Sequence, residues 1–155
     1  MRVRPLSVQD ITEIYEVLTH LEIAAVEMLA RRRLLAGELG RLEGAVDRMD
    51  KALEEEDYGA WGDADTDFHR LLVELCGNSR LTRVAINFQE QGVRIRMVTL
   101  PLRSRPVYSN VNHAAVLEAI RRGDPETARE IHFAHKRRWG REMADLLERH
   151  RIREI

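Results

Sequence analysis

Residues 36–55 read AGELGRLEGAVDRMDKALEE, and their apolar positions predict an amphipathic helix. These positions follow one another at alternating steps of three and four residues, which places them on a single helical face. The positions are Leu39, Leu42, Val46, Met49 and Leu53. Charged side chains occupy most of the other positions, so this stretch is expected to pack one face against neighbouring helices.

The rest of the chain continues the helical pattern. A capping-box variant at Ser7 and Asp10 starts the first helix, and Asp124 followed by Pro125 is a strong start signal for the last. No segment shows sustained alternation of apolar and polar residues. The sequence therefore predicts an all-α protein, a single antiparallel bundle of six to seven helices. The expected helices are 7–33, 36–55, 57–77, 79–100, 110–122 and 124–149, with a loop at 101–109.

The composition limits the classes of function. The chain has 155 residues, enough for one domain, and a formal net charge of −1, which gives no global basic field for nucleic acid. Cys76 is the single cysteine, so no intrachain disulfide can form, and we expect a reducing, cytoplasmic location. No apolar stretch approaches the roughly 20 residues that a membrane helix needs. We expect no membrane partner.

Four side chains suggest a metal site. Asp65 and His69 are four residues apart and would lie one turn apart on one helical face. His113 falls on an apolar stripe, and His135 lies midway along the last helix. One carboxylate and three imidazoles suit a divalent metal ion, with zinc as the first choice and nickel, manganese or iron as alternatives.

Two other functional hypotheses use the same residues. A lone histidine is more often a core or surface residue than a ligand, so the chain could be a metal-free dimerisation module. A metal-dependent hydrolase or lyase would need a general base beside metal-bound water. Glu74 and Glu118 are each five residues beyond a histidine, an offset of about 140° on an ideal helix, which makes both poor candidates.

Several motifs together resemble a known family. They are Asp65-x-x-Phe68-His69-x-x-Leu72, Gly77-Asn78-x-x-Leu81, His113-x-x-Val116-Leu117-x-Ala119-Ile120, Gly123-Asp124 and His135. This pattern resembles the FCD domain, the C-terminal effector-binding domain of FadR-type regulators in the GntR transcription-factor family. The resemblance extends over residues 5–149.

The resemblance implies a ligand-sensing domain rather than an enzyme. Metal-binding members of the family use one Asp and three His, which correspond to Asp65, His69, His113 and His135. We expect residues 7–150 to form the effector- and metal-binding domain, with 1–6 as a linker remnant. No winged-helix DNA-binding domain is expected in this chain, so a homodimer would contact DNA only through a missing N-terminal domain. The expected effector is a small organic acid or sugar acid.

One position departs from the family pattern. The family usually has an arginine, which meets an effector carboxylate, where this chain has Leu18. Arg94 or Arg96 could replace that guanidinium, and Asn78 and His132 are further candidates for effector binding.

Overall fold

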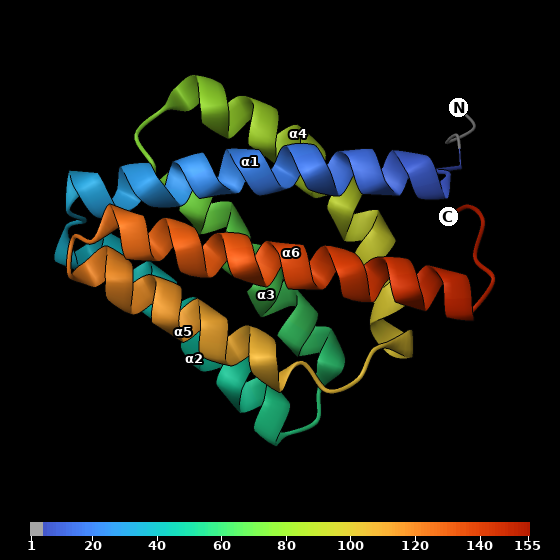
Figure 1. The fold of residues 1–155 in the computed structure, drawn as a ribbon. Helices are drawn as coiled ribbons and strands as arrows, with labels where there is room; N and C mark the ends of the chain where they lie inside the picture. Colours follow the sequence, from blue (N-terminus) through green and yellow to red (C-terminus); the bar gives the residue numbers. More distant parts are fainter. Residues whose placement is uncertain (1–4) are drawn as a thin grey trace.

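The computed structural model describes residues 5–155 and confirms an all-α bundle (Figure 1). A single 3-10 turn, η1 (Leu100–Leu102), and one isolated β-bridge, between Ser7 and Glu154, are the other regular features of this part of the chain. The helices are α1 (Val8–Arg32), α2 (Ala36–Glu54), α3 (Tyr58–Glu74), α4 (Ser79–Thr99), α5 (Val107–Arg121) and α6 (Pro125–Arg149).

The predicted caps are present. Ser7 and Asp10 form the capping box of α1, and the Asp124 side chain accepts from the backbone N–H of Thr127 at the start of α6. Gly77 and Gly123 follow α3 and α5 with φ of 84° and 68°, a conformation that favours glycine. The predicted loop 101–109 is shorter than expected, because η1 occupies its beginning and α5 starts at Val107.

The two ends of the described chain lie side by side. Figure 1 shows α1 and α6 running antiparallel across the molecule, with the beginning of α1 and the end of α6 at the same end. The backbones of Leu6 and Ile155 exchange two hydrogen bonds of 2.8 and 2.9 Å. Leu6, which the sequence suggested was linker, thus packs on the bundle; residues 1–4 of that expected linker lie outside the described residues.

The apolar core falls into two clusters. The larger one joins α1, α2, α3 and α5 around residues such as Leu29, Met49 and Phe68. The smaller one gathers Ile11, Ile14, Ile95, Met143 and Leu147 near the free ends of α1 and α6. Between the clusters, the inward faces of α1, α4 and α6 carry polar side chains, and this is where the candidate site lies. None of the described helices is long and apolar enough to cross a membrane.

Candidate functional site

The polar region between the two clusters encloses a cavity of about 60 Å³. Its walls come from α1, α3, α4, α5, α6 and the segment after η1. On α1 and α4 the lining residues are three or four positions apart, and on α3 and α6 they also include an adjacent pair, so each helix turns one stripe inward. These stripes include Tyr15, Leu18 and Glu22 on α1, Gln89, Val93 and Arg96 on α4, and His135, Lys136 and Trp139 on α6.

The structure brings Asp65, His69 and His113 together and places His135 beside the other two histidines. Nε2 of His69 and Nε2 of His113 face each other at 3.2 Å, and each lies 3.6 Å from Oδ1 of Asp65. A ring nitrogen of His135 lies within 4.8 Å of ring nitrogens of both other histidines. All four side chains are largely or completely buried. Three helices thus direct one carboxylate and three imidazoles at one small region.

Burial and neighbouring charges shift these groups in different directions. Burial lowers the pKa of His113 to about 3, and it also holds the pKa of His135 well below the ordinary value. Burial would lower the pKa of His69 too, but Glu22 and Asp65 outweigh it and raise that pKa to about 9. Burial alone would raise the pKa of Asp65. The opposing effect of His69, His113 and Arg96 is larger and holds the pKa of Asp65 well below its usual range.

The donor set fits a divalent transition metal. Neutral imidazoles are the form that binds metal, and the environments of His113 and His135 keep both rings neutral. Nδ1 of His113 and Nδ1 of His135 are buried, and neither has a hydrogen-bond partner among the described residues. An unpartnered buried nitrogen is costly, and a metal bound at Nδ1 of His135 would satisfy that atom. At His113 it is Nε2 that faces His69 and Asp65, so a metal bound there would leave Nδ1 without a partner.

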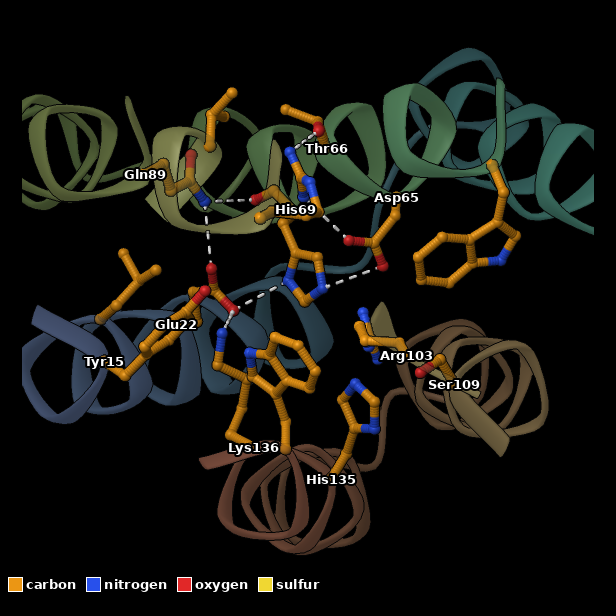
Figure 2. Close-up of a pocket in the computed structure, with 15 residues that line it drawn as sticks. Tyr15, Glu22, Asp65, Thr66, His69, Gln89, Arg103, Ser109, His135 and Lys136 are labelled. Carbon is orange, nitrogen blue, oxygen red and sulfur yellow. Dashed lines mark hydrogen bonds and ion pairs between the residues drawn. The ribbon is translucent and has the colours of Figure 1, made fainter. Parts of the chain in front are cut away.

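A buried carboxylate that the sequence analysis did not select lies next to this group. Oε2 of Glu22, a residue only 1% exposed, accepts from Nδ1 of His69 at 2.9 Å and lies 3.0 Å from Nε2 of His132. Nζ of Lys136 lies 3.1 Å from the same oxygen, and Nε2 of Gln89 donates to Oε1 at 3.2 Å. Figure 2 shows Glu22 at the centre of this network, with His69 linking it to Asp65. Glu22 thereby fixes the orientation of the His69 ring.

Glu22, His69 and His132 could also form a metal-binding group on distance alone. Lys136 argues against this, because its ammonium group already lies against the shared carboxylate oxygen and neutralises it. His132, which the sequence suggested for effector binding, is fully buried in this network and does not line the cavity.

The other three expected effector residues have different surroundings. Arg96 lines the cavity and donates from Nη1 to Oδ2 of Asp65 at 3.0 Å, with a second bond to Thr66. Arg94 is half-buried and does not line the cavity. Asn78 is the N-cap of α4, where its side chain accepts from two backbone N–H groups of the first turn, and it too lies outside the cavity lining. Leu18 does line the cavity, as the resemblance to the family implied for that position.

The acids considered as general bases lie at the surface. Glu74 is 3.7 Å from Arg41, and Glu118 pairs with Arg121. Neither lines the cavity, so neither is placed to activate a water molecule beside the histidines.

Comparison with known proteins agrees with this architecture. The model of the FCD domain matches residues 13–138. Among curated proteins, no sequence matches this chain closely enough to count as a relative.

Solved structures of other proteins share the fold, and two of them are compared with this chain. Streptococcus agalactiae GntR superimposes with a TM-score of 0.71 at 22% identity, covering 84% of this chain and 57% of that one. E. coli McbR/YncC has a TM-score of 0.78 at 18% identity, covering 95% of this chain and 72% of that one. The present chain thus spans little more than half the length of the GntR structure.

Proposed function

Since the chain belongs to the FCD domain family, which makes it an effector-binding regulatory domain rather than an enzyme, we propose that it senses a small organic acid with the help of one divalent metal ion. Asp65, His69, His113 and His135 would hold the metal. The single observation that carries this proposal is the convergence of Asp65 Oδ1 and the two Nε2 atoms of His69 and His113 within 3.6 Å of one another, with His135 beside them.

The surrounding network supports a ligand role for His69. Its Nδ1 is held by Glu22, which leaves Nε2 directed at Asp65 and His113. A carboxylate behind a ligating histidine fixes the tautomer and makes the ring a better ligand. Arg96 acts similarly on Asp65, because it holds Oδ2 while Oδ1 faces the histidines. Both predicted ligands on α3 are therefore oriented by a partner at the atom that faces away from the proposed metal position.

The donor set narrows the choice of metal. Three imidazole nitrogens with one carboxylate oxygen are typical of zinc, and nickel, manganese and iron also accept this set. A bound metal would act as a Lewis acid that orients an effector through its remaining coordination positions. The protein side chains would bind, orient and enclose that effector.

We also propose that effector binding alters DNA binding through a separate winged-helix domain, in a cytoplasmic homodimer. Exposed apolar side chains on α4 support a self-association surface, since Met97 is 73% exposed and Val84 and Val98 are about half exposed. A change in helix packing around the cavity could reach such a surface, because α4 contributes both to it and to the cavity.

Elemental analysis of gently purified protein tests the metal proposal. We expect about one equivalent of metal per chain in the wild type and less than about a tenth in His113→Ala, since the loss of one of four ligands opens the site. The matched control is His20→Ala, which removes an exposed histidine. Wild-type protein with less than about a tenth of an equivalent after incubation with zinc, nickel and manganese would favour the metal-free dimerisation module instead.

A further inference from the structure

The segment between η1 and α5 places an arginine over the cavity. The guanidinium carbon of Arg103 lies 3.7 Å from the centre of the Trp139 ring and 5.7 Å from that of Trp61. Within residues 5–155, no hydrogen bond or ion pair to the Arg103 guanidinium is found. Burial lowers the pKa of Arg103 from its ordinary value, and Asp65 opposes that shift electrostatically. Stacking holds the plane of the group and leaves its N–H edges free.

The other arginine and the lysine that line the cavity are already engaged. Arg96 binds Asp65 at 3.0 Å, and Nζ of Lys136 lies 3.1 Å from Glu22. The lining therefore holds two carboxylates, each with its own cation, and Arg103 as a third positive group. Glu142 also acts on Arg103 electrostatically, but its carboxylate pairs with Arg138 at 2.8 Å. A buried excess of positive charge favours an anionic ligand.

Arg103 is firmly positioned by its neighbours. Its backbone N–H donates to the carbonyl of Leu100, and Arg105 donates from Nη2 to the carbonyl of Leu53 on α2 at 2.8 Å. Ser109, which lines the same cavity, is buried at the beginning of α5. In Figure 2 the labelled side chains of Asp65, Arg103, Ser109 and His135 surround the same space.

We propose that Arg103 is the residue that binds the carboxylate group of the effector, through two parallel N–H···O bonds. This inference rests on the proposed sensing function, and it assigns the anion contact to a loop residue rather than to a helix. A carboxylate is planar and matches one edge of a guanidinium group. The cavity volume of about 60 Å³ limits the ligand to a few non-hydrogen atoms, so we infer a short-chain carboxylate.

Isothermal titration calorimetry on metal-loaded protein tests Arg103. The ligands are acetate, glycolate, L-lactate and malonate, with acetamide, glycolamide and lactamide as neutral counterparts and inorganic phosphate as a rival anion. The variants are Arg103→Gln, Arg103→Lys, which keeps the charge but loses the fork, and Arg94→Gln, a control on a half-buried arginine outside the cavity lining. Metal content and thermal unfolding are measured on every sample.

We expect the wild type to bind at least one of these carboxylates more tightly than its amide. Arg103→Gln should weaken carboxylate binding by about 10- to 100-fold, with unchanged metal content, because a charge-assisted pair is lost. Arg103→Lys should fall between the two, and Arg94→Gln should match the wild type.

Three results would overturn the assignment of Arg103. The first is that both Arg103 variants bind carboxylates with an affinity within about threefold of the wild type. The second is that the wild type binds none of the four carboxylates, and the third is that it prefers phosphate to all of them. A wild type that takes up no metal would instead refute the proposed metal site. The same titrations on metal-free protein would still support the assignment of Arg103 if the Arg103 variants bound carboxylates more weakly than the wild type. They would refute the assignment if the variants bound carboxylates as tightly.

Discussion

Glu22→Gln is the substitution that tests the buried network most directly. The change is nearly isosteric, so it opens no cavity and isolates the loss of negative charge. Glu22 is 1% exposed and has four polar contacts of 2.9–3.2 Å, one of them with the ammonium group of Lys136. In the variant, that ammonium group would stay buried without its counter-charge. Removal of one partner from a buried ion pair costs about 3–5 kcal/mol.

Urea unfolding of metal-free protein at pH 7, in the presence of a chelator, measures this cost. With a slope of about 2 kcal/mol per molar urea, we expect the midpoint of Glu22→Gln to fall by roughly 1.5–2.5 M. The control is Glu27→Gln on the same helix, where Glu27 forms a half-exposed pair with Arg31 at 3.0 Å. An exposed pair of this kind contributes about 0–1 kcal/mol, so the control should change little.

A double-mutant cycle identifies the cause. Lys136→Met removes the cation, and in the double variant neither charge remains, so the two destabilisations should be non-additive by at least about 1.5 kcal/mol. A loss below about 1 kcal/mol in Glu22→Gln, or additive losses in the double variant, would refute the idea that this carboxylate stabilises the bundle by neutralising Lys136.

Three further predictions concern the pocket. Metal-free protein should lose stability as the pH falls from 6.5 to 4.5, by up to about 1.4 kcal/mol per pH unit for each buried histidine. Burial lowers the pKa of His113 to about 3 and also lowers the pKa values of His132 and His135. The unfolded chain therefore binds protons at these histidines at a higher pH than the folded protein does. His69, whose pKa is raised to about 9, stays protonated in the folded protein and opposes this loss only near pH 6.5, where the unfolded imidazole is partly neutral. Flat urea midpoints would contradict the reasoning. Arg96→Gln should weaken metal binding by about 10- to 100-fold, measured in competition with a chromophoric chelator, because Asp65 loses the partner at Oδ2. The control Arg94→Gln should leave metal affinity unchanged. Equal metal affinities of Arg96→Gln and the wild type would show that Asp65 needs no such support. Metal should raise the affinity for a carboxylate, and by linkage that carboxylate must raise the affinity for metal by the same factor, as calorimetry of both binding orders would show. Absence of any coupling would mean that the two ligands do not share the pocket.

Much of this fold could be predicted from local sequence signals. Ser7 with Asp10 and Asp124 with Pro125 mark helix starts that need no tertiary context, and both occur as predicted. The beginning of α5 could not be placed in the same way, since Pro106 and Val107 carry no capping side chain and the turn depends on contacts made by the segment before it.

The site was less visible in the sequence, for reasons that differ between residues. Glu22 lies three to four positions from Leu18, Ala25 and Val26 on an apolar stripe, so a carboxylate facing the core could have been inferred from periodicity alone. Arg94 and Arg96 are about 200° apart on an ideal helix, which means that both could not face one cavity. Arg103 had no such signal: its position depends on Trp61 and Trp139, which come from two other helices.

The position of the charges suggests how this domain could act as a sensor. A stretch of apolar core is interrupted by Glu22, Asp65, Arg96, Arg103 and Lys136, although buried charges stabilise a fold poorly compared with apolar packing. Each of these side chains comes from a different segment or a different turn, so their mutual arrangement is the arrangement of the helices. A ligand that changes the charge balance in the cavity therefore changes the relative free energies of alternative helix packings. A domain whose total stability is only about 5–15 kcal/mol can be shifted by one such ligand.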